Sequence, residues 1–216
     1  MEGNKMEQIL ANINLNNIFF IGGSPCGGKS TVAAMLAAET GYTNYKVDDF
    51  LALHMLCASR EGMPHSKRAL AFDNEQMWMR DPAIQRDEEI LVYEEVLRFT
   101  LLDLEELAQN GPVIADGSGL MPELMAKLEV PRTNYICMVP TDSFQRDEYA
   151  QRTWVSRLLI GCHDPVKAFD NWMTRDALFA DYVYAQAVKH GYQTLIVDGK
   201  RTVGEDFEIV KRCFCI

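Results

Sequence analysis

The sequence predicts an α/β fold in which helices cover both faces of a parallel sheet. Two observations carry this prediction. A glycine-rich segment at 23–30 stands between a short apolar run and a helix-forming run. Short apolar runs then alternate with longer segments of helical periodicity about five times, which is the order typical of parallel sheets. The 216 residues suit one such domain, spanning 1–216.

The first strand and its loop dominate the chain. Residues 18–21 form an apolar strand, and residues 23–30 match the pattern G-x-x-x-x-G-K-[ST] before a helix at 31–39. Such a loop turns backbone N–H groups toward anionic oxygens, and the helix N-terminus adds further donors. We therefore expect ATP and Mg²⁺ to bind here, with Lys29 on the outer phosphates and Ser30 on the metal. The expected nucleotide-binding residues are Gly23, Ser24, Pro25, Cys26, Gly27, Gly28, Lys29, Ser30 and Thr31.

The first half of the chain continues this alternation. Helical spacing of Met6, Ile9, Leu10 and Ile13 predicts a short helix before the first strand. Gly41 is expected to end the helix at 31–39. A second strand at 45–47 leads into a helix at 50–60, and breakers predict an irregular segment at 61–84. A long helix follows at 84–109, with a buried stripe formed by Ile90, Tyr93, Leu97, Leu101, Leu104 and Ala108.

The second half predicts three more strands, at 113–115, 134–139 and 194–197. A short helix is expected at 122–128 and a closing helix at 205–213. Between the last two strands, one helix is expected from a cap at Asp142 to about residue 160. After a break at 161–165, a second helix runs from 166 to 190, where Gly191 ends it.

Three aspartates stand at predicted strand ends, where ligands of open parallel sheets bind. Asp48 is placed to accept a proton from an attacking hydroxyl, and Asp49 either assists catalysis by holding Mg²⁺ through water or caps the following helix. Asp116 is placed to complete the Mg²⁺ site with Ser30. Asp116-x-x-Gly119 also mimics a GTPase motif, but no Asn-Lys-x-Asp motif follows the fourth strand.

The segment 142–176 carries four arginines, at 146, 152, 157 and 175. Phosphoryl transfer requires fixed positive charge over the travelling group. On a continuous helix Arg146 and Arg157 would lie on one face, with Arg152 at its border. We assign Arg152 and Arg157 to the transferred phosphate and Arg146 to the nucleotide; the alternative is a solvated surface with ordinary helix pairs.

Composition excludes several classes of function. A net charge of −10 without a basic stretch argues against nucleic-acid binding. The six cysteines lack zinc spacing and fit reduced thiols in a cytoplasmic protein, and Cys162-His163-Asp164 is expected not to act as a triad. No apolar run reaches membrane length, and no leader pattern stands at the N-terminus. The expected partner is a small-molecule phosphate acceptor, and the expected state is a monomer or homodimer.

The chain resembles the phosphate-loop kinase superfamily of adenylate kinase-like, shikimate kinase-like and chloramphenicol phosphotransferase-like enzymes. The residues that carry the resemblance are 23–31, Asp48-Asp49 and the ending at 195–199. It implies a three-layer α/β/α fold with strand order 2-3-1-4-5. It also implies an acceptor-binding insertion at 50–86, a helical lid at 142–176, and a last segment, with Gly199, that closes over the base.

Three functions remain open at this stage. Val47-Asp48-Asp49-Phe50-Leu51 looks like the branches that phosphorylate a hydroxyl, which favours a kinase for a small metabolite, nucleoside or antibiotic. A nucleoside monophosphate kinase would instead use arginines of the insertion to bind the acceptor's phosphate. A non-catalytic regulatory module would bind ATP through the same loop without transferring phosphate.

Overall fold

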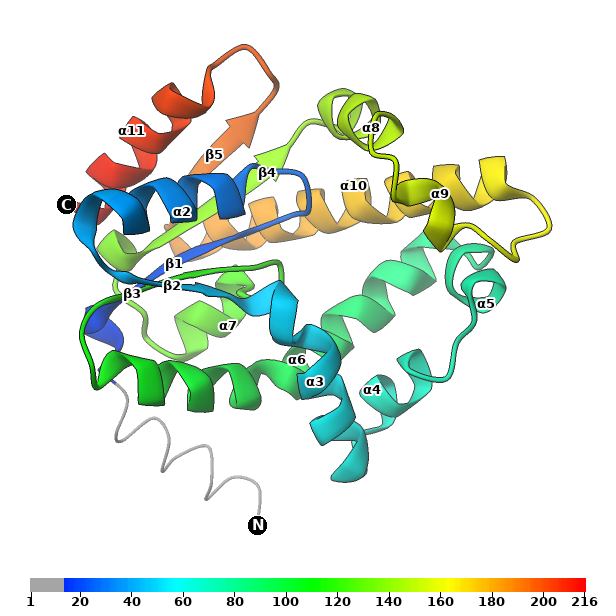
Figure 1. The fold of residues 1–216 in the computed structure, drawn as a ribbon, viewed down its shortest axis with the longest axis horizontal. Helices are drawn as coiled ribbons and strands as arrows, with labels where there is room; N and C mark the ends of the chain where they lie inside the picture. The colour runs from blue at the N-terminus through cyan, green and yellow to red at the C-terminus, as the bar shows by residue number, and fades with distance from the viewer. Residues whose placement is uncertain (1–13) are drawn as a thin grey trace.

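Five strands form one parallel sheet in the computed structural model, which describes residues 14–216 (Figure 1). The spatial order is β2-β3-β1-β4-β5, which confirms the predicted 2-3-1-4-5 sheet. The strands are β1 Ile18–Gly23, β2 Thr43–Lys46, β3 Val113–Asp116, β4 Tyr135–Pro140 and β5 Gln193–Val197. The predicted helix over Met6 to Ile13 lies outside the described residues.

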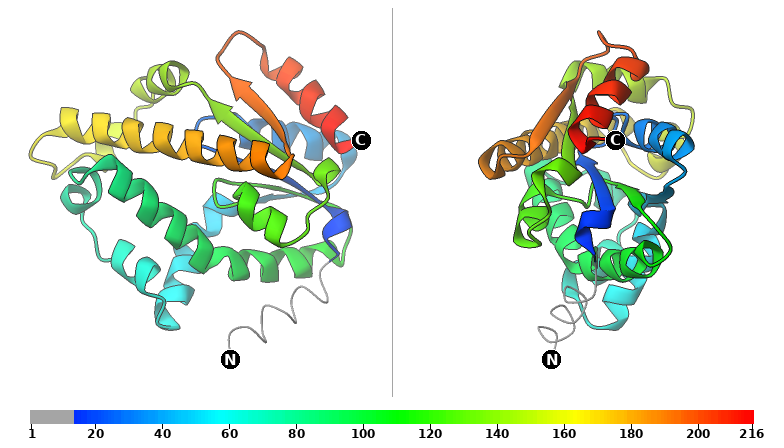
Figure 2. Two further views of the ribbon diagram at one scale, coloured as in Figure 1. Left: turned by 180° about the vertical axis from the view of Figure 1, so that it is seen from behind. Right: turned by 90° about the vertical axis from the view of Figure 1, so that its left-hand side faces the viewer.

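Helices cover both faces of the sheet, as the view along its edge shows (Figure 2). On one face lie α2 Lys29–Thr40 and α11 Val203–Phe214, whose core includes Leu36 and Phe207. On the other face, Leu101 and Phe179 belong to the larger core cluster. The helices of that face are α6 Pro82–Ala108, α7 Pro122–Lys127 and α10 Pro165–His190, and two 3-10 turns, η1 Leu15–Asn17 and η2 Arg132–Asn134, precede β1 and β4.

The central strands align their carboxyl ends at one edge. Every residue of β3 and β4 is buried, because helices lie on both faces. Asp116, the last residue of β3, pairs in register with Ile21 of β1 and Lys46 of β2. The loop after β1, the start of the helix after β2 and Asp116 therefore meet at one place.

The prediction of an irregular segment at 61–84 was wrong. This segment holds two short helices, α4 Pro64–Ala69 and α5 Asn74–Trp78, after α3 Val47–Arg60. Glu95 of α6 accepts hydrogen bonds from the backbone N–H groups of His65 and Ser66, so α4 is fixed by a contact from distant sequence. A capping box between Asp73 and Gln76 begins α5.

The single helix predicted from 142 to about 160 was also wrong. The chain forms α8 Asp142–Ala150 and a short α9 Val155–Leu158 with turns between them. Arg146 and Arg157 therefore do not share one helix face. The cap is Thr141, whose hydroxyl accepts from the Phe144 N–H, rather than Asp142.

An aromatic cluster joins α5 to the segment α8–α10. Trp78 stacks on Trp172 with ring centroids 4.5 Å apart, and Tyr149 meets Trp172 edge-on at 5.2 Å. This packing brings the end of α5 beside the turn that carries Arg152. Among residues 14–216, none of the helices combines the length and apolar character that crossing a membrane requires.

Candidate functional site

The loop between β1 and α2 is held in place by β4. Gly23 has a φ of +122°, and a Cβ at this position would lie 1.9 Å from the Met138 carbonyl oxygen, so only glycine fits. The Ser24 N–H donates to that same carbonyl at 3.2 Å. Cys26 and Gly28 also have positive φ, so the loop curls around its own backbone before α2 begins at Lys29.

Lys29 reaches back across the loop. Its side chain is buried, and its Nζ donates to the Ser24 carbonyl at 2.6 Å and to the Ser118 Oγ at 3.4 Å. An ammonium held over a curl of backbone N–H groups provides the positive charge that a phosphate needs.

Asp116 and Ser30 form a pair beside Lys29. The Ser30 hydroxyl donates to Asp116 Oδ1 at 2.5 Å, while Oδ2 is buried without a hydrogen-bond partner in the described part of the chain. Burial raises the pKa of Asp116, and the Ser30 hydrogen bond and the Lys29 charge oppose the rise. An orphaned carboxylate oxygen beside a hydroxyl fits Mg²⁺, which is held by one or two carboxylates together with phosphates. Residues 14–216 contain no cluster of three or more His, Cys, Asp or Glu side chains suited to a metal.

Asp48 lies in the first turn of α3, and its Oδ1 accepts from the Ser118 N–H at 3.1 Å. The start of α3 can come this close to Ser118 because residue 117 is glycine, where a Cβ would stand 2.7 Å from the Val47 Cβ. The interpretation of Asp49 as a helix cap was wrong, because Lys46 occupies the cap position. The Asp49 side chain is exposed, and no hydrogen bond to it is found between residues 14 and 216.

A cavity of about 350 Å³ opens above the loop. Arg152 reaches it from the turn between α8 and α9, where its guanidinium lies 4.6 Å from the centroid of the Tyr149 ring. Its Nη2 is 3.4 Å from the Cys26 Sγ. The residues that line this phosphate cavity are Pro25, Cys26, Gly27, Gly28, Lys29, Ser30, Thr31, Asp48, Tyr149 and Arg152.

Three of the predicted site residues lie elsewhere. Arg146 is bound to Asp142, Asp170 and Thr174, so it ties α8 to α10. Arg157 is exposed on α9 and does not line the phosphate cavity. Gly199 follows β5 with a φ of +77° and faces the Phe144 ring.

A second cavity, of about 150 Å³, lies against one face of α6, and we name it the α6 cavity. Its α6 residues recur at three- and four-residue steps, as expected for one helix face. It is lined by Leu51, Met55, His65, Arg68, Ala69, Phe72, Met77, Arg80, Gln85, Glu88, Glu89, Val92, Tyr93 and Arg175.

Two contacts connect the cavities. The Tyr93 ring packs on Gly119, where a Cβ would lie 3.0 Å from the ring, and Gly119 follows the Ser118 that binds Asp48. Arg175 lines the α6 cavity and pairs with the buried Asp176 at 2.6 Å, and the Asp176 carbonyl accepts from the Ser24 hydroxyl. The two cavities are therefore neighbours across the edge formed by the strand ends.

The side chains of Cys162, His163 and Asp164 do not meet in a catalytic triad, as expected. The Cys162 thiol donates to the Asn74 carbonyl, His163 pairs with Glu75, and Asp164 caps α10. All six cysteines have free thiols.

No protein-family model and no curated protein sequence matches the chain. Among solved structures, it is similar to deoxyadenosine kinase from M. mycoides with bound dATP, with 14% identity and a TM-score of 0.46 over 92% of this chain and 99% of that one. It is also similar to a kinase candidate from Chloroflexus aurantiacus J-10-fl, with 16% identity and a TM-score of 0.41 over 90% and 96%. The assignment of a phosphate-loop kinase fold rests on the strand order and the loop itself.

Sequence reasoning missed Tyr149 in the phosphate cavity and the face of α6 that lines the α6 cavity. A signal existed for the latter, since Gln85, Glu88, Glu89 and Val92 share the helical spacing of the stripe that continues through Tyr93. The polarity of Gln85, Glu88 and Glu89 is typical of a solvated helix face. The helices α4 and α5 cover that face, and neither was predicted.

Proposed function

We propose that the protein is an ATP- and Mg²⁺-dependent phosphotransferase that phosphorylates a hydroxyl group of a small, uncharged acceptor. The observation that carries the proposal is that Asp48 and Arg152 line the same cavity as Lys29 and the loop. A carboxylate and a guanidinium that face a phosphate-binding loop supply the proton acceptor and the fixed charge that phosphoryl transfer needs.

Each residue then has one task. The loop amides and Lys29 bind the phosphates, and Ser30 and Asp116 would hold Mg²⁺, which supplies charge neutralisation when bound. Asp48, oriented by the Ser118 N–H, takes the proton of the acceptor hydroxyl at its free carboxylate oxygen. Arg152 stabilises the charge on the transferred group. Residues 142–176 act as the lid, and residues 50–86 bind the acceptor with α6.

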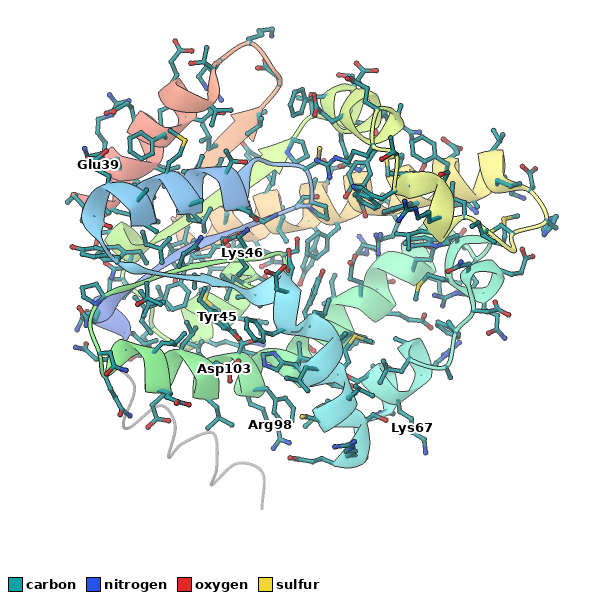
Figure 3. All side chains as sticks on the ribbon, viewed as in Figure 1. Glu39, Tyr45, Lys46, Lys67, Arg98 and Asp103 are labelled. Atoms are coloured by element: carbon teal, nitrogen blue, oxygen red, sulfur yellow. The ribbon has the colours of Figure 1, made fainter. Side chains whose placement is uncertain are left out.

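The charge balance of the α6 cavity favours an uncharged acceptor over a nucleoside monophosphate. Arg68 and Arg80 both pair with Glu88, and Arg175 pairs with Glu89 and Asp176, so three guanidiniums meet three carboxylates. Lys67 points outward from α4 (Figure 3) and does not line the cavity. A doubly charged phosphate would have to break these pairs.

A direct test measures ADP production from Mg·ATP with pools of neutral small alcohols, nucleosides and phenicol antibiotics, and separately with AMP, CMP, UMP and GMP. We expect stimulation by a neutral acceptor, with label from the γ-phosphate on its hydroxyl. The Lys29→Ala variant should show none. Stimulation by monophosphates alone would support the monophosphate kinase instead. Binding of a non-hydrolysable ATP analogue without stimulation by any pool would support a regulatory module.

A further inference from the structure

We infer that the α6 cavity binds a single planar ring that presents hydrogen-bond donors, and that Gln85 and Glu89 select that ring. This inference rests on the proposed function, because the ring would be the part of the acceptor farthest from the transferred phosphate. Its evidence is the size of the cavity and two buried side-chain oxygen atoms, one of Gln85 and one of Glu89, that lack hydrogen-bond partners among residues 14–216.

The dimensions and walls of the cavity favour one ring. A cavity of about 150 Å³ has the size that holds a benzene molecule in a protein interior. The Phe72 and Tyr93 rings line it, and Met55 and Met77 supply flexible, polarizable side chains that adapt to a flat ligand. The guanidinium of Arg80 lies 4.3 Å from the Phe72 centroid, which fixes one side of that ring.

Gln85 offers the cavity a hydrogen-bond acceptor that has no partner among residues 14–216. Its side chain is 3% exposed, and its Nε2 donates to the carbonyls of Arg80 at 2.8 Å and Trp78 at 3.3 Å. Two carbonyl partners settle which end of the amide is the NH₂ group. The Oε1 is left buried without a partner among residues 14–216, which is costly unless a ligand donates to it.

Glu89 offers a second hydrogen-bond acceptor one helical turn away. Its Oε1 accepts from the Tyr93 hydroxyl at 3.1 Å and faces Arg175 at 3.0 Å, whereas Oε2 is buried without a hydrogen bond from the described residues. Residues four apart on a helix have Cβ atoms about 5–6 Å apart, so the two free oxygens stand on one face. Both vacant positions are acceptors, and the ligand must therefore supply donors.

The position of Tyr93 sets the direction of the ligand. The Tyr93 ring packs on Gly119, next to the Ser118 that orients Asp48. A ring seated against Gln85 and Glu89 would extend its hydroxyl-bearing group past Tyr93 toward Asp48. The acceptor class is thus a neutral ring with N–H or O–H donors at one edge and a hydroxyl on a side group.

The experiment compares three rings with equal numbers of heavy atoms: m-xylene, 3-methylphenol and resorcinol, which carry zero, one and two hydroxyl donors. Affinities for the full-length protein are measured by NMR titration without nucleotide, for the wild type, for Gln85→Met and for the control Gln109→Met, an exposed glutamine at the end of α6. We expect Gln85→Met to weaken resorcinol binding about tenfold and to leave m-xylene within threefold. Gln109→Met should change neither.

Equal effects of Gln85→Met on m-xylene and resorcinol would overturn the inference, as would no binding of any ring. If Gln85→Met does not fold, the side-chain amide signal of Gln85 in the wild type decides. It should shift with resorcinol and much less with m-xylene, and an unmoved signal at saturation refutes the assignment. Because nucleotide is absent, ring binding can succeed while phosphate transfer fails. Conversely, phosphate transfer to acceptors that bind the wild type and Gln85→Met equally well would refute only this inference.

Discussion

The phosphate cavity and the α6 cavity are neighbours built in opposite ways. Seven consecutive residues, 25–31, form most of the first, and its ligand groups are largely backbone N–H groups and one lysine. The second draws side chains from α3, α4, α5, α6 and α10, with no more than two consecutive residues at any point. Local sequence therefore specifies the donor side of the proposed reaction, and long-range packing specifies the acceptor side.

The two cavities also differ in charge. In the phosphate cavity, Lys29 and Arg152 donate to a backbone carbonyl, a hydroxyl and a thiol rather than to carboxylates, so their charge is available to an anion. In the α6 cavity each guanidinium is paired with a carboxylate. Available positive charge in the phosphate cavity suits a negatively charged phosphate donor, and the paired charges of the α6 cavity suit an uncharged phosphate acceptor. The predictions below test this contrast.

Lys29→Ala gives the largest expected effect. Removing the ammonium should lower kcat/KM on the order of 10³-fold and weaken binding of Mg·ATP, because the phosphates lose their only buried cation among the described residues of the cavity. Steady-state kinetics and calorimetry with a non-hydrolysable ATP analogue measure both. Lys189→Ala, at an exposed lysine near the end of α10, is the control. Unchanged analogue affinity in Lys29→Ala would contradict the assignment.

Asp48→Asn should lower kcat by about 10²- to 10⁴-fold and leave the affinity for the ATP analogue nearly constant, because a general base acts only on the acceptor. The asparagine oxygen can still accept from the Ser118 N–H, so the fold is retained. The same substitution at Asp49 shows which acid is the base. A larger loss of kcat in Asp49→Asn than in Asp48→Asn would show that Asp49 is the general base.

Gly23→Ala should destabilise the fold more than Gly62→Ala. Both glycines have positive φ, but a Cβ at Gly23 would collide with the Met138 backbone, whereas Gly62 faces open space. We expect about 1 kcal/mol for Gly62→Ala and more than about 3 kcal/mol for Gly23→Ala. Urea unfolding measures the two free energies. Similar losses would mean that the loop is not anchored on β4.

Asp116→Asn should stabilise the protein without Mg²⁺ while impairing nucleotide-dependent function. Burial raises the pKa of Asp116 above its unfolded value, so the ionised carboxylate destabilises the fold at neutral pH. That cost disappears as the pH falls through the folded pKa. The variant should therefore have a larger free energy of unfolding than the wild type at neutral pH, and the difference should shrink in acid. A stability difference that grows as the pH falls would show that the fold lowers the pKa of Asp116 instead of raising it, and would contradict this prediction.

Sequence patterns predicted the first strand, the glycine-rich loop and the helix after it because their determinants are local. The run from Ile18 to Thr31 contains the strand, the loop and the helix start, and parallel pairing of β1 with β3 brings Asp116 to Ser30. The turn at Arg152 was not predictable in the same way. It depends on Trp154 and Tyr149 packing on Trp172, which lies about twenty residues further along the chain.

The sequence placed acceptor binding in the insertion at 50–86 but did not predict that one face of α6 lines the same cavity, because that arrangement depends on long-range packing. The polar residues Gln85 and Glu89 are typical of an exposed helix face when read from the sequence alone. In the fold Gln85 is buried and Glu89 is half-buried, and α4 packs on the same helix, where Glu95 binds the backbone of His65 and Ser66. The capping pattern of Asp73 and Gln76 was the one local signal for α5.

The most direct test of the account is a crystal structure with Mg²⁺ and a non-hydrolysable ATP analogue. We expect the β- and γ-phosphates in the loop, Lys29 Nζ turned from the Ser24 carbonyl to a phosphate oxygen, and the metal bound by Ser30 and, directly or through water, by Asp116. The γ-phosphate should lie between Arg152 and Asp48 and face the α6 cavity. A nucleotide bound outside the loop, or a γ-phosphate directed away from Asp48, would contradict the claim that the two cavities form one transfer site.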